Sequence, residues 1–241
     1  MSRSNKINQI TGKQSGFTLI EIAIVLVIIG LLLAGVLKGQ ELINSARVKN
    51  LAGDFKNIPV FIYAYQDRFK ALPGDDIAVV THLGALATMA TTPSASIGNG
   101  TINGTWDSIT ATDESVLFWQ HVRIADLTAG QRTVTVAGGI LDPYFPINTV
   151  GGRIGIQGNL GTAASPTPIN GIPGTYVICS ANIAGKIARQ LDITLDDGNT
   201  ATGSMRATAA PAGTAAINTG QSAAIISAPD DNTLYTICMG V

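Results

Sequence analysis

The feature that most constrains this chain is an apolar run from Ile22 to Leu37, which contains no charged residue. Together with the apolar residues that precede it from Phe17, the segment is long enough to cross a bilayer as a helix. Glu21 places one carboxylate inside that segment. An ionised carboxylate in the hydrocarbon core costs about 2.5–3.5 kcal/mol on insertion scales, so an acid there is by default a functional residue. Glu21 therefore requires a partner.

A new chain end would supply a positive charge close to Glu21. Phe17 lies four residues earlier, so on a helix the two residues share a face and are separated by about 6 Å along the axis. If the chain were cut after Gly16, the α-amine of Phe17 would be a cation within reach. The amine could belong to the same subunit or to a neighbouring one. In the second case the ion pair would direct assembly.

Two simpler interpretations of the N-terminus fit less well. A secretory signal peptide has an apolar core of about 7–15 residues followed by a cleavage site of small residues. The run here is longer, and a cut after Ala34 or Gly39 would place Leu32 or Leu37 where a small residue is required. A plain membrane anchor accounts for the hydrophobicity but leaves Glu21 unexplained.

At these residues the chain resembles the prepilins, the precursors of type IV pilins and of the pseudopilins of type II secretion. The resemblance rests on the leader ending Lys13-Gln14-Ser15-Gly16, on the segment from Phe17 to Glu21 and on the apolar run that follows. It implies that a prepilin peptidase cuts between Gly16 and Phe17 and that Phe17 is then N-methylated. It also implies that Glu21 sets the subunit register during filament assembly.

The predicted domain organisation follows from this resemblance and from the residue pattern. Residues 1–16 form the leader, residues 17–72 a long helix whose part 17–37 is the transmembrane or filament-core segment, and residues 73–241 a globular head. Beyond Leu37 the pattern predicts an amphipathic continuation of the helix, because apolar residues recur at steps of three, four or seven. These residues are Leu42, Ala46, Phe55, Ile58, Ile62, Tyr65 and Phe69.

We expect an α+β fold of the pilin type, with the long helix packed against a small antiparallel sheet. Short apolar or alternating segments predict the strands, and the Gly- and Thr-rich segment 85–113 predicts a surface loop. Two short helices are predicted, one from Thr112-Asp113-Glu114 to Gly130 and one from Ile183 to Leu191. The predicted strands are 133–137, 153–160, 175–180, 204–208 and 234–239.

Cys179 and Cys238 are the two cysteines of the chain. In an exported head a disulfide between them is the expected arrangement, and the alternative is two separate buried thiols. Pilins commonly close a C-terminal loop with such a bridge, and this pair resembles it. The sequence therefore predicts a head whose C-terminal region is closed by a disulfide.

Charge and residue types favour a structural protein without a cofactor. The leader carries three basic residues and no acid, so its removal leaves 12 basic against 16 acidic residues. This net negative charge gives no indication of nucleic-acid binding, which is typical of basic surfaces. There are two histidines, His82 and His121, and no H-E-x-x-H, nucleophile elbow or Walker loop. His121 is interpreted as a packed or rim residue, and no enzymatic activity is predicted.

One acidic segment could supply oxygen ligands for calcium. Asp192, Asp196, Asp197 and Asn199 surround Gly198. The same residues also make a good turn, and their spacing matches no EF-hand, so we interpret them as structural and predict no metal. Asp75-Asp76 and Asp230-Asp231 are interpreted in the same way.

The sequence thus predicts a structural subunit of a type IV pilus-like filament. The alternatives are a pseudopilin of a type II secretion system and, in a different class, a membrane-anchored binding domain that does not polymerise. The expected partners are the prepilin peptidase, copies of the chain or related subunits, and an inner-membrane assembly machinery. Before assembly the protein would cross the bacterial inner membrane once with its head in the periplasm, and afterwards it would lie in an extracellular or periplasmic filament.

Overall fold

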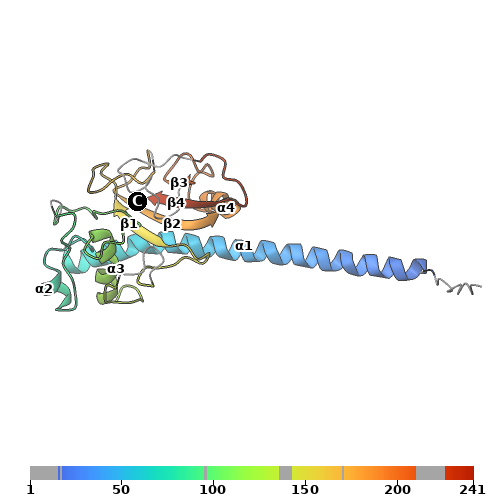
Figure 1. The fold of residues 1–241 in the computed structure, drawn as a ribbon, viewed down its shortest axis with the longest axis horizontal. Helices are drawn as coiled ribbons and strands as arrows, with labels where there is room; N and C mark the ends of the chain where they lie inside the picture. Colours follow the sequence, from blue (N-terminus) through green and yellow to red (C-terminus); the bar gives the residue numbers. More distant parts are fainter. Residues whose placement is uncertain (1–15, 17, 95–96, 136–142, 170, 210–225) are drawn as a thin grey trace, which may run out of the picture. The chain divides into compact units, whose positions relative to one another are not determined.

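The computed structural model describes residues 16, 18–94, 97–135, 143–169, 171–209 and 226–241 (Figure 1). The chain divides into two compact units, one that ends at Ile43 and one from Asn44 to Val241. Helix α1, Leu19–Phe69, belongs to both units because their boundary falls inside it. The predicted leader, apart from Gly16, and the predicted new terminus Phe17 lie outside the described residues.

In the first unit, the apolar residues of α1 from Leu19 to Leu37 are all exposed to solvent. Among the described residues, α1 is the helix that is long and apolar enough to cross a membrane. A side chain added at Gly30, Gly35 or Gly39 would meet no atom within 4 Å. This segment therefore has no core of its own, and its apolar surface is available to lipid or to other helices.

The amphipathic pattern predicted beyond the apolar run is confirmed in the second unit at Phe55, Ile58, Ile62 and Tyr65, which are buried, whereas the predicted face residues Leu42 and Ala46 are exposed. Pro59 lies inside the helix, which ends at Phe69. Lys70 then adopts a positive φ of 56°, and the breakers Pro73 and Gly74 follow. One face of this part of α1 is buried, and its buried residues are Val48, Leu51, Ala52, Phe55, Ile58, Ile62 and Tyr65.

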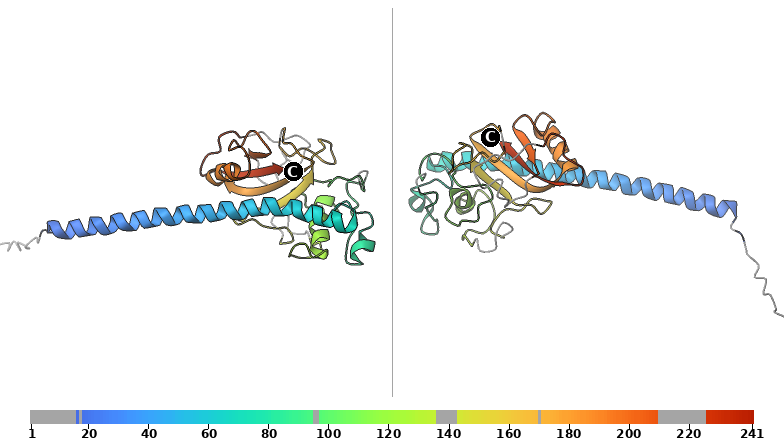
Figure 2. Two further views of the ribbon diagram at one scale, coloured as in Figure 1. Left: turned by 180° about the vertical axis from the view of Figure 1, so that it is seen from behind. Right: turned by 45° about the horizontal axis from the view of Figure 1, so that its top comes forward.

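The head contains a four-stranded antiparallel sheet in the order β1-β2-β4-β3 (Figure 1). The strands are β1 Ile154–Gly158, β2 Tyr176–Ala184, β3 Met205–Thr208 and β4 Leu234–Gly240. All four correspond to predicted strands. Figure 2 shows the sheet lying along the second half of α1, which agrees with the α+β fold that the sequence predicts.

Strand β2, one of the two central strands, is buried on both faces because its side chains alternate between two clusters up to Ala181, and a register shift between Ser180 and Ile183 returns Ile183 to the face of Ile178. Ile178 and Ile183 join the main core, to which α1 contributes Phe55 and Ile62. The other face belongs to a smaller cluster beneath loop segments. That cluster contains Trp106, Ile169, Ile172, Val177, Cys179, Ala181 and Cys238.

The fifth predicted strand, 133–137, is wrong in its described part, because residues 133–135 form no strand, and residues 136–137 lie outside the described residues. Side chains of α3 hold the chain just before this segment. The Arg123 guanidinium donates to the carbonyl of Gln131, and the Gln120 amide donates to the carbonyl of Arg132. The local apolar pattern therefore did not indicate strand pairing.

Three short helices complete the part of the head that the structure describes. Helix α2, Val79–Leu83, was not predicted, because five residues are too few to show a helical repeat. Helix α3, Glu114–Ile124, begins where expected but ends before the predicted stop at Gly130, since Asp126 adopts a positive φ of 60°. Helix α4, Gly185–Leu195, begins later than predicted because β2 extends to Ala184.

Candidate functional site

The N-terminus of α1 is closed by a capping box made of Thr18 and Glu21. Thr18 precedes the first helical residue, Leu19, and Glu21 is the third residue of the helix. The Thr18 N–H and hydroxyl both donate to Glu21 Oε2 at 2.8 Å, and the Glu21 N–H donates back to Thr18 Oγ1 at 3.3 Å. This reciprocal arrangement satisfies backbone donors that a helix leaves free at its first turn.

The capping box gives Glu21 a partner within its own chain. Both hydrogen bonds from Thr18 end on Oε2, and within the described part of the chain no donor reaches Oε1. Phe17 lies outside the described residues, so the predicted pairing of Glu21 with the Phe17 amine stays a prediction. Gly16, on the N-terminal side of the predicted cut, is exposed.

Sequence reasoning missed the role of Thr18, although a signal was present. Thr18-Leu19-Ile20-Glu21 is the S/T-x-x-E pattern of a capping box directly before an apolar run. A carboxylate in an apolar segment indicates a cationic partner, and the amine of Phe17 is the cation nearest in sequence once the chain is cut after Gly16. The structure adds Thr18 to the residues that determine how Glu21 is held.

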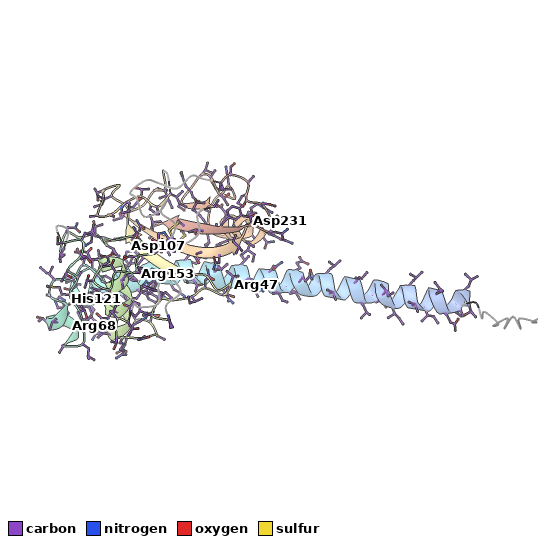
Figure 3. All side chains as sticks on the ribbon, in the orientation of Figure 1. Arg47, Arg68, Asp107, His121, Arg153 and Asp231 are labelled. Atoms are coloured by element: carbon purple, nitrogen blue, oxygen red, sulfur yellow. A yellow bond between two sulfur atoms is a disulfide. The ribbon has the colours of Figure 1, made fainter. Side chains whose placement is uncertain are left out.

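The apolar half of α1 offers places where another helix could approach closely. Gly30 and Ala34, and likewise Gly35 and Gly39, follow a small-xxx-small spacing. Each of the three glycines has open space where a side chain would stand. Figure 3 shows the neighbouring side chains projecting from the helix. The surface is therefore suited to packing against helices of other subunits.

The cysteines occupy directly opposed positions on adjacent strands. Cys179 of β2 is paired with Cys238 of β4, and the two form a disulfide across a Cα–Cα distance of 4.1 Å. Both residues are fully buried, beside Trp106. The bridge fastens the C-terminal strand to the centre of the sheet. It belongs to the packed face of the head that does not hold the α1 side chains.

His121 makes structural hydrogen bonds with both of its ring nitrogens. It is fully buried on α3 (Figure 3). Nδ1 accepts the Gly74 N–H at 2.9 Å, so Nε2 carries the proton and donates to the Thr88 carbonyl at 2.9 Å. Burial lowers the pKa of His121 to about 4, which keeps the ring neutral at pH 7. This environment agrees with the interpretation of His121 as a packed residue.

An open surface depression of about 550 Å³ lies beside the end of α1, with Asp75, Asp76 and His82 in its lining. Asp76 Oδ2 accepts the Tyr65 hydroxyl and is 2.7 Å from His82 Nδ1. Asp76 Oδ1 accepts the Ala78 N–H. These contacts join α1 to the turn that leads into α2, so they give Asp76 a structural role.

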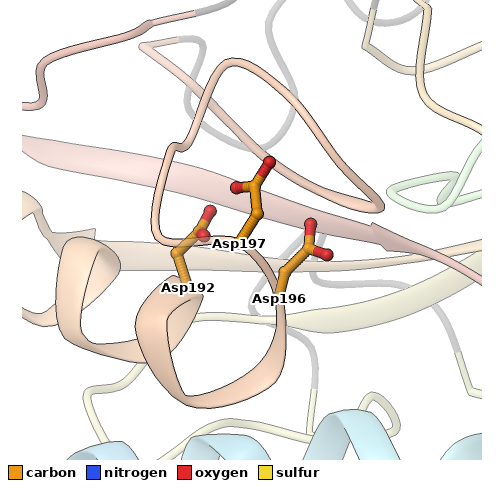
Figure 4. Close-up of side chains that lie close together, drawn as sticks. All are labelled: Asp192, Asp196 and Asp197. Carbon is orange, nitrogen blue, oxygen red and sulfur yellow. The ribbon is translucent and has the colours of Figure 1, made fainter.

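The acidic turn after α4 brings three carboxylates together (Figure 4). Asp192, Asp196 and Asp197 each place one oxygen within 4.8 Å of the others, a spacing that one calcium ion could bridge because it binds oxygens at 2.3–2.6 Å. The chain itself already donates to all three carboxylates. The donors are the Gly198 N–H to Asp192, the Met205 N–H to Asp196, and the Asn199 N–H and Thr202 hydroxyl to Asp197.

The charges of this turn are unequally stabilised. Burial, together with the charges of the neighbouring Asp196 and Asp197, raises the pKa of Asp192 to about 6. The hydroxyl of Thr202 and the N–H of Asn199 lower the pKa of the exposed Asp197. The hydrogen bonds agree with a structural turn between α4 and β3. That this turn binds no metal stays a prediction.

Comparison with known families bears on the N-terminal segment. Residues 11–37 match the family model described as the prokaryotic N-terminal methylation motif. This is the prepilin-type signature of type IV pilins and pseudopilins, so the resemblance noted in the sequence is confirmed. No curated protein matches the chain.

The chain therefore carries the N-terminal signature of a prepilin. The signature indicates a structural subunit rather than an enzyme, and together with the apolar helix α1 it fits membrane anchoring before assembly.

Proposed function

We propose that this protein is a structural subunit of a type IV pilus-like filament. A prepilin peptidase cuts the chain between Gly16 and Phe17, Phe17 is N-methylated, and the mature subunit polymerises through α1. The observation that carries the proposal is the prepilin signature at residues 11–37, with Glu21 at the start of a helix whose apolar side chains from Leu19 to Leu37 are all exposed.

The proposed assembly mechanism uses the two oxygens of Glu21 differently. Oε2 caps its own helix through Thr18. Oε1 accepts a hydrogen bond from the methylated amine of Phe17 in a neighbouring subunit, so a charge that is costly in lipid is paired when subunits meet. Burial of residues 22–37 among neighbouring helices, with close approach at Gly30 and Gly35, then holds the filament together.

The proposed cellular context follows from this mechanism. The uncut subunit crosses the bacterial inner membrane once with its disulfide-bonded head in the periplasm, and an inner-membrane assembly machinery extracts it into an extracellular or periplasmic filament. A pseudopilin of a type II secretion system would use the same N-terminal mechanism. The bridge between Cys179 and Cys238 favours the pilus, because pilins commonly close their C-terminal region in this way.

Intact-mass analysis of filaments sheared from cells tests the processing step. The expected chain begins at Phe17, is heavier by one methyl group and is lighter by two hydrogens for the disulfide. A polymerised chain that retains residues 1–16 would contradict the proposal. Shed filaments would favour a pilus, whereas a chain that stays in the cell envelope and is needed for protein export would favour the pseudopilin.

Substitution of Glu21 tests the assembly step. Glu21→Ala should still be inserted and cut but should give few filaments, because the neighbouring amine loses its partner. Glu41→Ala is the matched control, since Glu41 lies on the same helix, is exposed and forms an ion pair with Lys38 at 2.7 Å. Normal filament yield from Glu21→Ala would exclude a register role, and an equal loss in both variants would show a general defect of the helix.

A further inference from the structure

Two carboxyl groups that are distant in the sequence meet in the interior of the head. Asp75 lies in the turn after α1, and Glu114 is the first residue of α3. Asp75 is 6% exposed and Glu114 is 0% exposed. Neither residue belongs to the prepilin signature or to the proposed assembly surface. Their burial therefore requires a separate explanation.

Both acids hold the same loop through hydrogen bonds from its backbone. Asp75 Oδ1 accepts the N–H groups of Gly98 and Asn99, and Oδ2 accepts that of Gly100 at 2.6 Å. Glu114 Oε2 accepts the N–H of Asn103 at 2.7 Å and its side-chain amide at 2.9 Å. Residues 98–103 are thus fastened at one end to the turn after α1 and at the other end to α3.

One carboxyl oxygen of this acid pair, Glu114 Oε1, lacks a hydrogen-bond donor among the described residues. This oxygen is buried, and the carboxyl groups of Asp75 and Glu114 interact with each other. Burial raises the pKa of the Tyr176 phenol of β2, and the charges of Tyr63 and Asp75 contribute to that rise. Among the described residues neither acid forms a salt bridge with a basic side chain. Two buried negative charges side by side would be uncompensated.

We propose that Glu114 holds a proton at neutral pH and that its Oε1 hydroxyl donates to the carboxylate of Asp75. One proton then joins the two ends of the segment 98–103, and we call this arrangement the acid-pair latch. Asp75 is the ionised member, because three backbone N–H groups point at its oxygens. Glu114 is the protonated member, because its second oxygen has no other donor among the described residues.

The electrostatics of the site support this assignment. Burial, with a smaller contribution from the charge of Asp75, raises the pKa of Glu114 to about 8, against the hydrogen bonds from Asn103. Burial also raises the pKa of Asp75, but the N–H groups of Gly100, Gly98 and Asn99 oppose that effect. The Glu114 carboxyl is therefore neutral at pH 7 in the folded head and ionised in the unfolded chain.

The latch makes the stability of the head depend on pH in a defined window. An acid whose pKa is raised on folding stabilises the fold below its unfolded pKa, and this stabilisation is lost as pH rises through the folded value, here from 4.5 to about 8. Unfolding in that window releases one proton, so the unfolding equilibrium constant rises about tenfold per pH unit. Asp192, with a pKa near 6, and His121, with an unfolded pKa of 6.5, act at lower pH, so the interval from 6.5 to 8 lies above the transitions of both.

The substitution Glu114→Gln provides a matched test, because an amide has the shape of a protonated carboxyl and its N–H₂ can donate to Asp75 permanently. The full-length protein in detergent micelles is unfolded in urea between pH 6.5 and 8. The unfolding equilibrium constant of the wild type should rise about tenfold per pH unit. That of Glu114→Gln should change little over the same interval. Asp75→Asn should be destabilised throughout, since its amide cannot accept all three backbone N–H groups. Glu41→Gln is an exposed control and should follow the wild type.

Infrared spectroscopy tests the proton directly. At pH 7 the wild type should show a protonated-carboxyl stretching band that disappears with a midpoint near pH 8 and is missing in Glu114→Gln. A band that is absent at pH 7, or that has the same strength at pH 7 in Glu114→Gln as in the wild type, would overturn the proposal. So would a pH slope retained by Glu114→Gln. Urea unfolding with added calcium completes the test. If calcium stabilises the wild type and Glu114→Gln abolishes that effect, the acid pair binds a cation in place of the proton, and the proposal is overturned.

Discussion

Removal of the disulfide between Cys179 and Cys238 should destabilise the head by an amount that follows from its place in the chain. The bridge closes a loop with a sequence separation of 59 residues. On the chain-entropy model, a loop of that length raises the free energy of unfolding by about 4 kcal/mol. The double substitution to alanine is preferred to serine, because both positions are fully buried and a serine hydroxyl there would need a new hydrogen-bond partner.

The expected shift in melting temperature is large enough to measure. For a folded unit of about 150–250 residues, 1 kcal/mol corresponds to roughly 2–4 °C, so loss of the bridge should lower the melting temperature by roughly 8–16 °C. Trp106 and Trp119 are the two tryptophans, and both are buried in the second unit. Their fluorescence in the full-length protein in detergent micelles therefore reports on the head.

Reductant supplies the matched comparison. Reduction of the wild type should lower the melting temperature by about the same amount as the double alanine substitution, and reductant should leave the double variant unchanged. The sheet should keep its order in both, because β2 and β4 remain paired along the ladder around residues 179 and 238. A melting temperature within about 2 °C of the oxidised wild type would refute the reasoning, since it would mean that the closed loop is already constrained in the unfolded chain.

Two further predictions concern the helix terminus and the buried histidine. Thr18→Ala should weaken the start of α1 by about 1 kcal/mol and reduce filament yield, whereas Thr18→Ser should retain both, as measured by helix content in micelles and by shearing assays. Below pH 6.5 the unfolded state binds the His121 proton before the folded state does, so His121 opposes the gain in stability that Glu114 and Asp192 contribute as pH falls from 6.5 towards 4. His121→Gln should therefore gain stability relative to the wild type as pH falls over this interval in urea unfolding, and a constant difference between the two proteins would contradict the assigned role of His121.

The helix and the N-terminal signature could be predicted because their signals are local. The signal consists of an apolar run, a glycine before it and Glu21 within it. These residues alone predict a charged group in a membrane-length helix, whatever the sequence of the head. The amphipathic continuation to Phe69 is equally local, since one face repeats with the helical period. The pairing of the cysteines needed no geometry, because a chain with two cysteines has one possible intramolecular bridge.

The four strands of the sheet were also predicted, but a fifth predicted strand, 133–137, is wrong in its described part. Short apolar segments between glycines and prolines marked the four strands of the sheet. The segment 133–137 has the same local pattern, yet Gln120 and Arg123 of α3 bind the backbone carbonyls just before it. Whether such a segment pairs with a strand depends on its tertiary contacts. The local periodicity of the sequence gives no information about those contacts.

The acid pair could not be predicted for a related reason. Asp75 follows Pro73 and Gly74 in a sequence that indicates a turn, and Glu114 stands where acids are favoured at the start of a helix. Each residue has a sufficient local explanation on the surface of a protein. Their burial beside each other arises because α3 packs against the turn after α1, and Gly74 has no room for a side chain next to the Glu114 carbonyl.

The capping box changes how the role of Glu21 in assembly should be understood. A carboxylate without any partner would raise the free energy of the unassembled subunit in the bilayer. Pairing with a neighbouring subunit would then recover the whole of that free energy on assembly. Thr18 already donates two hydrogen bonds to Oε2, so part of the cost is offset before any neighbour arrives. In the proposed assembly mechanism, the free energy that Glu21 contributes to polymerisation is therefore limited to what a second donor adds at Oε1. On this account Glu21 selects the register of a neighbouring helix, while the exposed apolar surface of residues 22–37 supplies most of the cohesion.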